Sequence, residues 1–425
     1  MKDYRKIAEH CPCGEKHSLS TDVIVSGSGA TEKMIEYVRL RVDNTSDVLI
    51  VSDENTEKYA RPVSEKLECD VYILPKTAHA NEIYTSELTE YINTSSRPAL
   101  FIACGSGSVH DITRFCAYDA EIPFISYPTA ASVDGFVSGV AAMTMYGQKL
   151  TYPSASPIAL FADPDVYSTA PNKLTASGVG DVIGKITALY DWKAANLLSG
   201  EALCPEIYEL MKDALDTVID AAKSKSDKRD FTEKVMNGLI LSGIAMQLQG
   251  NSRPASGSEH HMSHFWEMHV INDETDALHG EKVGVGTLIA LDLLKSNIDL
   301  IERFCNIDLK KVFDREMIDS VYGVLADGII KENLPTGDIS SSVIAKLGNC
   351  NADVISKIKQ NTAELPSSDE IRDLLLACGA PVTLSELSLP DSPEFAEQSA
   401  LFSPYVRNRL TVAKLISAVK LSVVK

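Results

Sequence analysis

The sequence has few of the groups that bind nucleic acid or membrane surfaces. Its Lys and Arg residues number 40 against 59 Asp and Glu, which gives a formal net charge of −19. Phosphate backbones and anionic lipids are bound by basic stripes, so this balance argues against both as general partners. It leaves room for one anionic small molecule in a locally positive pocket.

Long apolar runs are also missing. No stretch approaches the roughly eighteen apolar residues that a membrane span needs. The amino-terminal residues Met-Lys-Asp-Tyr-Arg-Lys are polar and do not form the apolar core of a signal peptide. The nine cysteines are scattered, which is typical of a reduced chain rather than of a disulfide framework. We therefore expect a cytoplasmic protein.

Two cysteines lie close together near the amino terminus. Cys11, Cys13 and His17 could form a small metal site, but their spacing differs from the usual C-x2-C pattern. We interpret the segment as a plain amino-terminal arm.

In the first part of the chain, strands alternate with helices. Val48–Ser52 is a continuous apolar run, which is typical of a strand buried on both faces of a parallel sheet. Further strands are predicted at 22–26, 71–74, 99–104 and 123–127, with helices at 30–42, 60–67, 86–94 and 112–118. This alternation indicates a doubly wound α/β domain.

Two more strands, Val140–Met145 and Pro157–Ala162, are expected to run antiparallel and to close this domain. From Pro171 onward, apolar residues recur at helical spacing and convincing strands are few. The 425 residues exceed what one hydrophobic core usually fills. We expect an α/β domain over residues 1–166 and an all-helical domain over 167–425.

A glycine-rich turn follows the predicted strand 99–104. The run Gly105-Ser-Gly-Ser-Val-His-Asp111 leads into a helix, where free backbone N–H groups and the helix dipole can bind a pyrophosphate. The run is not the G-x-G-x-x-G fingerprint, and a structural turn uses the same residues. Alone, the motif indicates nucleotide binding only weakly.

Two other segments favour a dinucleotide. Asp53 ends a predicted strand, where a carboxylate can accept from ribose hydroxyls and favours NAD over NADP. The alternative for Asp53 is a helix N-cap. The loop from Pro128 to Gly139 is rich in small and hydroxyl residues and is suited to line a cleft for nucleotide and substrate.

Histidines cluster in one later segment. Three of the nine in the chain, His260, His261 and His264, fall within five positions, and His279 follows. On a helix, His260 and His264 are i, i+4 neighbours that project from one face. Converging imidazoles indicate a metal or active site, although local hydrogen bonds could also satisfy them as structural histidines.

These motifs together resemble the iron-containing alcohol dehydrogenase and dehydroquinate synthase superfamily, and within it the sn-glycerol-1-phosphate dehydrogenases. The matching segments are residues 105–114, 127–135, 176–181, 253–264 and 279–287. The resemblance implies a Rossmann-like nucleotide-binding α/β domain followed by an all-α metal-binding domain.

The resemblance also implies roles for individual residues. Asp181, His260 and His279 would hold one divalent metal (zinc, nickel or iron) as the catalytic set. Asp134 and His264, with Asp181, would contact the substrate. The implied NAD contacts, with NADP also possible, are Asp53, Gly107, Ser108, Val109, His110, Asp111, Thr129, Ala130, Ala131, Ser132 and Ser138.

The implied reaction is the reversible NAD(P)H-dependent reduction of dihydroxyacetone phosphate to sn-glycerol 1-phosphate, a glycerophospholipid precursor, by a homodimer. Because Lys185 and Lys282 lie near ligand positions, either could supply charge for the substrate phosphate. Glycerol dehydrogenase and dehydroquinate synthase are alternatives within the superfamily. A non-catalytic nucleotide-binding protein is the alternative from another class, and it would predict the loss of a metal ligand or of the glycine loop.

Overall fold

A six-stranded parallel sheet forms the core of the amino-terminal half. The computed structural model describes residues 4–95, 97–224, 227–268, 271, 277–347 and 350–423. The strand order is β1-β8-β5-β4-β2-β3, and every neighbouring pair is parallel. The strands are β1 (Val23–Ser26), β2 (Val48–Asp53), β3 (Asp70–Leu74), β4 (Leu100–Gly105), β5 (Phe124–Pro128) and β8 (Ala159–Ala162).

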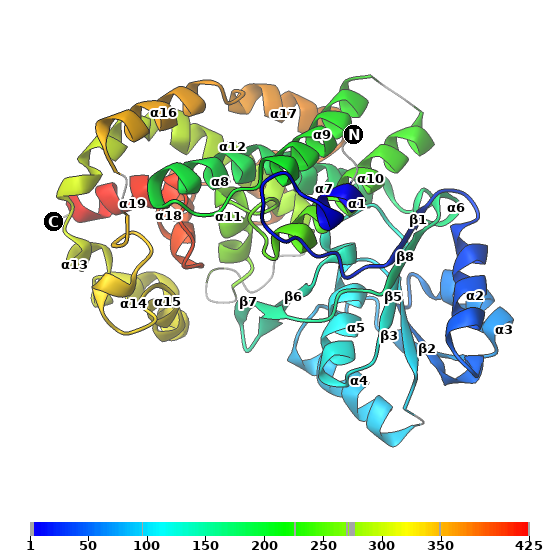
Figure 1. The fold of residues 1–425 in the computed structure, drawn as a ribbon. Coiled ribbons are helices and arrows are strands. Elements are labelled where there is room, and N and C mark those ends of the chain that lie inside the picture. The colour runs from blue at the N-terminus through cyan, green and yellow to red at the C-terminus, as the bar shows by residue number, and fades with distance from the viewer. Residues whose placement is uncertain are drawn as a thin grey trace.

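Helices cover both faces of this sheet (Figure 1). Ile50 of β2 packs in one hydrophobic cluster with Met34, whereas its neighbours Leu49 and Val51 pack in another with Ile112. Both faces of β2 are therefore buried, which explains its continuous apolar run. The covering helices include α2 (Ala30–Arg41), α3 (Glu57–Leu67), α4 (Glu82–Thr94) and α5 (Gly107–Asp119). The predicted α/β fold is confirmed.

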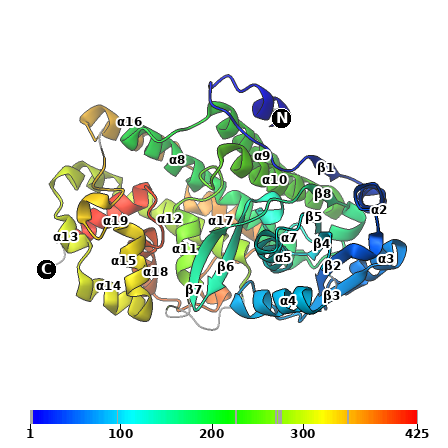
Figure 2. The same cartoon turned by 60° about the horizontal axis from the view of Figure 1, so that its bottom comes forward.

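The prediction for the two closing strands was wrong in its pairing. Residues 159–162 form β8, a parallel strand between β1 and β5 in the main sheet. The antiparallel partner of β6 (Val140–Met145) is instead β7 (Gln148–Pro153), joined by a turn at Tyr146 and Gly147, both with positive φ. Figure 2 shows this hairpin beside α5, facing the helical half.

The carboxyl-terminal half is helical, and the described residues after 163 contain no strand. Among the described residues, no helix is long and apolar enough to cross a membrane. The α-helices are α6 (Pro164–Tyr167), α7 (Asn172–Ile183), α8 (Lys185–Ser199), α9 (Pro205–Lys223), α10 (Lys228–Gln249), α11 (Ser258–Trp266), α12 (His279–Asn297), α13 (Leu309–Val312), α14 (Arg315–Tyr322), α15 (Ala326–Asn333), α16 (Ala352–Ala363), α17 (Ser368–Ala377), α18 (Pro393–Phe402) and α19 (Val412–Val423). A short helix α1 (Tyr4–Glu9) precedes the sheet.

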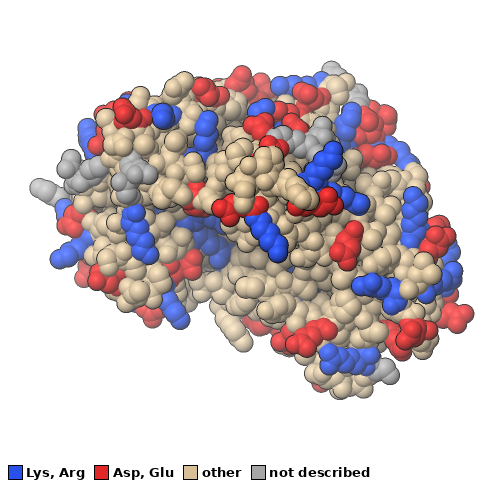
Figure 3. Space-filling model, viewed as in Figure 1, with Lys and Arg blue, Asp and Glu red and all other residues tan. Residues whose placement is uncertain are grey.

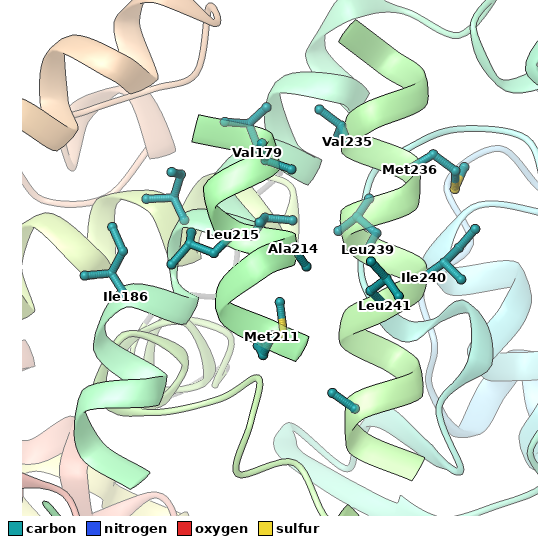
Figure 4. Packing of buried hydrophobic residues seen from close by; sticks show 14 of the residues in the cluster. Val179, Ile186, Met211, Ala214, Leu215, Val235, Met236, Leu239, Ile240 and Leu241 are labelled. Atoms are coloured by element: carbon teal, nitrogen blue, oxygen red, sulfur yellow. The ribbon is translucent and has the colours of Figure 1, made fainter. Parts of the chain in front are cut away.

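One hydrophobic cluster joins the two halves. It includes Val179, Leu215 and Leu239 from the helices, which Figure 4 shows packed together. The same cluster contains Ala131 and Leu160 from the sheet side. The core is thus continuous across residues 166 and 167, and a domain boundary there stays a prediction.

Candidate metal and cofactor site

Glycines bring α7 and α12 into backbone contact. A Cβ placed on Gly280 would lie 1.9 Å from the carbonyl oxygen of Ser177, and one on Gly180 would lie 2.1 Å from that of Gly280. No side chain fits at either position, so these glycines permit the close approach. The contact places Asp181, near the end of α7, beside His279 at the start of α12.

Helix α11 reaches the same point through a third glycine. A Cβ on Gly286 of α12 would lie 2.8 Å from the carbonyl oxygen of Glu259. Donor atoms of Asp181, His260 and His279 consequently all lie within 4.8 Å of one another. The structure therefore brings together the three residues that the family resemblance predicts as metal ligands.

The two imidazoles are oriented as metal ligands are. Nδ1 of His260 lies 2.6 Å from Glu259 Oε1, and Nδ1 of His279 lies 3.1 Å from Glu267 Oε1. An imidazole whose Nδ1–H donates to a carboxylate presents the lone pair of its Nε2. Nε2 of His260 lies 3.5 Å from Asp181 Oδ1. This one-oxygen, two-nitrogen donor set fits one divalent cation with further positions open to substrate.

Both oxygens of Asp181 are held in place. Oδ1 accepts from Lys185 Nζ at 2.7 Å, and Oδ2 accepts from the backbone N–H of Asp134 at 3.0 Å. Although burial raises the pKa of Asp181, the Lys185 ammonium and His260 outweigh it and hold this pKa well below its usual range. Asp181 is therefore an anion, as a metal ligand must be.

Lys185 is one of the two predicted candidates for binding the substrate phosphate, but its ammonium group is paired with carboxylates of the protein. Its Nζ is fully buried and also lies 2.8 Å from Asp134 Oδ2. Burial lowers the pKa of Lys185, but the carboxylates of Asp134 and Asp181 raise this pKa by more than burial lowers it. The Lys185 side chain therefore stays charged. One ammonium shared by two carboxylates has little left for a phosphate. Lys185 instead stabilises the ligand Asp181.

Lys282 is similarly paired. Its Nζ lies 3.1 Å from Glu267 Oε1, and Lys149 Nζ from the β6-β7 hairpin lies 2.9 Å from Glu267 Oε2. Ser263 also donates to Glu267 at 3.0 Å. Burial raises the pKa of Glu267, but the two ammonium groups and His279 hold it well below its usual value. The hairpin thus contacts the carboxylate that orients a metal ligand.

The other two clustered histidines differ in their surroundings. The ring of His264 lies 6.3 Å from that of His260 and 6.0 Å from that of His279. Its buried Nδ1 has no hydrogen-bond partner among the described residues. His261 is buried on another side, and burial together with Arg409, Lys414 and other nearby cations lowers its pKa well below the usual value. His264 is therefore beside the metal site, and His261 is not.

The glycine-rich turn opens a helix, as a phosphate site requires. Ser106 is the N-cap of α5, which begins at Gly107, five residues earlier than predicted. The first-turn N–H groups of Gly107, Ser108 and Val109 have no partner within the helix. They lie at the carboxyl end of β4, where an anion would meet the helix dipole.

Within that turn, the His110 side chain points into the protein. Its Nδ1 lies 2.9 Å from the carbonyl oxygen of Ser106, and its Nε2 lies 2.8 Å from Ser126 Oγ. Burial, with a contribution from Arg114, lowers the pKa of His110 to about 3. The ring is a neutral structural group, and the backbone N–H of His110 also donates to the carbonyl oxygen of Ser106, at 3.1 Å.

The remaining predicted cofactor residues lie on neighbouring strand ends. The buried Thr129 Oγ1, after β5, has no hydrogen-bond partner among the described residues. Ser132 Oγ lies 2.7 Å from Ser106 Oγ, which ties this loop to the glycine turn. Asp53 Oδ1 accepts from the N–H groups of Asn55 and Thr56 at 2.9 Å and so closes a turn ahead of α3, whose N-cap is Thr56 rather than Asp53.

The loop at 134–140 is held in place by Arg114, for which the sequence predicted no role. The buried Arg114 donates to the carbonyl oxygens of Ser138 and Val140, each at 2.9 Å. Ser138 Oγ itself bonds the backbone of Val140. Asp111 lies 3.6 Å from Arg114 Nε, so its carboxylate also supports this loop.

Other structural partners of the site were also missed. They include Glu259, Glu267 and Asp191, the last accepting from Ser258 N and Oγ at the start of α11. Glu259 directly precedes a predicted ligand, and this adjacency could have nominated it. Asp191 has no comparable signal, because it lies 67 residues from Ser258.

Comparison with known proteins gives consistent matches. The sequence profile of a family described as iron-containing alcohol dehydrogenase matches residues 25–171. A protein of Bacillus licheniformis named glycerol-1-phosphate dehydrogenase (NAD(P)+) is 38% identical over 334 residues, 76% of this chain and 81% of that protein. A Pyrococcus furiosus protein of the same name is 35% identical over 271 residues, 63% of this chain and 76% of its own length.

Solved structures show the same fold. The glycerol dehydrogenase of Schizosaccharomyces pombe superimposes with a TM-score of 0.60 at 18% identity, covering 94% of this chain and 88% of that one. An iron-containing alcohol dehydrogenase of Thermococcus thioreducens gives a TM-score of 0.59 at 15% identity, covering 96% and 98%. At such identities the likeness shows the architecture alone.

Proposed function

The chain belongs to the glycerol-1-phosphate dehydrogenase family of the iron-containing alcohol dehydrogenases, and from this premise we propose that it reversibly reduces dihydroxyacetone phosphate to sn-glycerol 1-phosphate. NAD(P)H is the hydride donor, as the names of the relatives indicate. The observation that carries the proposal is the convergence of Asp181, His260 and His279 beside the carboxyl ends of the sheet strands.

The protein would hold one divalent metal through Asp181, His260 and His279. When bound, such a metal acts as a Lewis acid that polarises the substrate carbonyl. Glu259 and Glu267 fix the two imidazoles, and Lys185 balances the charge of Asp181 and Asp134. These buried partners keep the ligands in position before substrate arrives, which lowers the reorganisation cost of reaction.

The cofactor would lie across the strand ends, with its pyrophosphate at the start of α5. Backbone N–H groups of residues 107–109 would bind the phosphates. The unpaired Thr129 Oγ1 is available to hydrogen-bond the dinucleotide. Asp53 Oδ2 is suited to a ribose hydroxyl, because the bonds that the Asp53 carboxylate accepts from the described residues of its turn use only Oδ1.

The substrate would lie between the metal ligands and His264. Burial, with Arg407, lowers the pKa of His264 well below its usual value, so the ring is neutral and serves as a hydrogen-bond partner. Reduction of a ketone consumes one proton, and His264 is placed to orient a water or hydroxyl that delivers it. Asp134, the other predicted substrate contact, lies next to Asp181 and Lys185.

Arg407 is our candidate for the substrate phosphate. It lies near His264, and among the described residues it has no carboxylate partner within 4.0 Å. Its Nη2 donates to Thr151 of the β6-β7 hairpin at 2.6 Å, so it lies between the two halves. Figure 3 shows basic side chains at a hollow between them, on a molecule that is otherwise rich in acidic groups. A guanidinium binds phosphate with two parallel hydrogen bonds.

Oxidation of NADH with three substrates tests the proposal. We expect turnover with dihydroxyacetone phosphate, far less with dihydroxyacetone, and none with a heptulosonate phosphate. An Arg407→Ala variant should raise KM for dihydroxyacetone phosphate by about tenfold or more while leaving turnover of dihydroxyacetone unchanged. Preference for dihydroxyacetone would identify a glycerol dehydrogenase instead.

A further inference from the structure

A second cluster of metal-binding side chains lies outside the catalytic site. Donor atoms of Cys11, Cys13, His17 and Cys204 all lie within 4.8 Å of one another. Cys11 Sγ is 3.4 Å from Cys204 Sγ, and Cys13 Sγ is 3.2 Å from His17 Nε2. The amino-terminal arm supplies three of these side chains, and Cys204 is the N-cap of α9. In Figure 1 the arm, in dark blue, passes beside α9 and α10 before it enters β1.

We propose that these four residues bind a structural zinc ion. Three thiolates and one imidazole are a donor set of closed structural zinc sites. With Zn–S bonds of about 2.3 Å, the corners of a tetrahedron lie roughly 3.8 Å apart, which is close to the spacing of this cluster. All four positions are filled by protein, so the site has no opening for a substrate.

The histidine is oriented for this role by the backbone. Nδ1 of His17 donates to the carbonyl oxygen of Leu248 at 2.7 Å, near the end of α10. A proton on Nδ1 leaves a lone pair on Nε2, and this atom faces Cys13 Sγ. His17 is only 8% exposed, so its ring is fixed rather than mobile.

The arm folds around the cluster as zinc-binding turns do. Gly14 has φ 83, a left-handed conformation, and its N–H donates to the carbonyl oxygen of Cys11 at 3.2 Å. The N–H of Glu15 donates to Cys13 Sγ at 3.4 Å. A backbone N–H directed at sulfur stabilises a thiolate, and the turn brings both arm cysteines to the same side.

A disulfide between Cys11 and Cys204 explains less of this arrangement. It would involve only two of the four side chains, and it would not explain the fixed orientation of His17 or the turn at Cys13. The zinc ion accounts for all four. It would tie the arm to the start of α9 and, through His17, to the end of α10. Helix α1 has only six residues and buries Ile7 alone, so such an anchor would add much of its stability.

Metal analysis of variants tests the site. The wild-type enzyme, purified with reductant and supplied with zinc, should carry about one more zinc per chain than Cys11→Ser, Cys13→Ser or Cys204→Ser. The control Cys378→Ser changes a cysteine of similar partial exposure outside the cluster and should keep all its zinc. The three cluster variants should melt at lower temperature yet keep the wild-type kcat, because none of these residues belongs to the catalytic site.

Cobalt substitution of the wild-type protein gives a second readout that does not depend on variants that fold. A three-sulfur, one-nitrogen site should show sulfur-to-cobalt charge transfer and the intense visible bands of tetrahedral coordination. Equal zinc content in wild type and Cys11→Ser would overturn the proposal. So would wild-type cobalt protein without a sulfur charge-transfer band, or a Cys11–Cys204 disulfide in protein purified under reductant.

Discussion

The two donor clusters of this chain differ in chemistry and in construction. Asp181, His260 and His279 offer one oxygen and two nitrogens and leave coordination positions open. The arm cluster with Cys204 offers three sulfurs and one nitrogen and is complete without a substrate. The first is built by helices packed through glycines, whereas the second joins a short arm to a helix end. A catalytic metal needs an open coordination position for its substrate, whereas a metal bound entirely by protein side chains stabilises the fold.

The supporting groups differ in the same way. The catalytic ligands are backed by charged partners, Glu259, Glu267 and Lys185, which set both orientation and local charge. The arm cluster is backed by neutral backbone groups, the carbonyl of Leu248 and the N–H of Glu15. Charged partners tune how strongly a metal polarises a substrate, and a structural ion does not need such tuning.

Removing a catalytic ligand should have the largest effect on activity. We expect Asp181→Asn and His260→Ala to lower kcat/KM by about a thousandfold or more, since Lewis-acid stabilisation is worth several kcal/mol. Steady-state assays with metal analysis would show this, while circular dichroism should show an intact fold. Retention of both bound metal and activity in either variant would disprove the ligand assignment.

Filling a glycine contact should damage the catalytic site through its scaffold. In Gly280→Ala the new methyl would lie 1.9 Å from the carbonyl oxygen of Ser177, so α7 and α12 must separate. We expect a loss of about 1–3 kcal/mol of unfolding free energy together with weaker metal binding. Gly284→Ala is the matched control, because its nearest contact is an ordinary 3.4 Å. Equal stability in the two variants would contradict the packing argument.

Changing a carboxylate behind a ligand should have an intermediate effect. Glu259→Gln keeps the shape but removes the charge that holds Nδ1 of His260. Metal affinity should fall by about 10- to 100-fold, with little change in melting temperature of the metal-free protein. Competition titration with a chelating dye measures this. Unchanged affinity would mean that Glu259 does not orient the ligand.

The smallest effect, measured as the change in metal affinity per pH unit, is expected from pH. Burial and Lys185 lower the pKa of His260, but Asp181 and Glu259 outweigh them and raise it to about 9 in the metal-free protein. The ring is protonated below this pKa, so binding a metal must release the proton. The apparent affinity at this site should rise about tenfold per pH unit up to that pKa and then level off. Calorimetric titrations in buffers of different ionisation enthalpy would detect the released proton, and a flat profile would argue against His260.

Local patterns in the sequence predicted much of this molecule. The apolar run at 48–52 and the helical spacing after Pro171 gave the parallel sheet and the helical half, because burial dictates both patterns. The resemblance predicted Asp181, His260 and His279 as one ligand set, and their donor atoms lie within 4.8 Å of one another. The pairing of β8 was missed, because its apolar residues predict a strand but not its neighbours. Helix α5 begins earlier than predicted, because Gly107 and the polar residues of its first turn mask the helical pattern.

Partners that are distant in sequence could not be predicted. Cys204 lies 193 residues from Cys11, and no local pattern connects it to the arm. Without it, two cysteines and a histidine were interpreted as a plain arm. Lys185 was one of two candidates for the substrate phosphate because it lies near ligand positions, but burial and two carboxylates give it a different role. Tertiary contacts, rather than residue type, decided each of these cases.

The configuration of the product tests the proposed function most directly. Wild-type enzyme loaded with metal should convert dihydroxyacetone phosphate and NADH to glycerol phosphate that is entirely the sn-1 enantiomer. A stereospecific glycerol-3-phosphate dehydrogenase that oxidises only the sn-3 form can report this, and it should find no substrate in the product. A product that this enzyme oxidises completely would contradict the account.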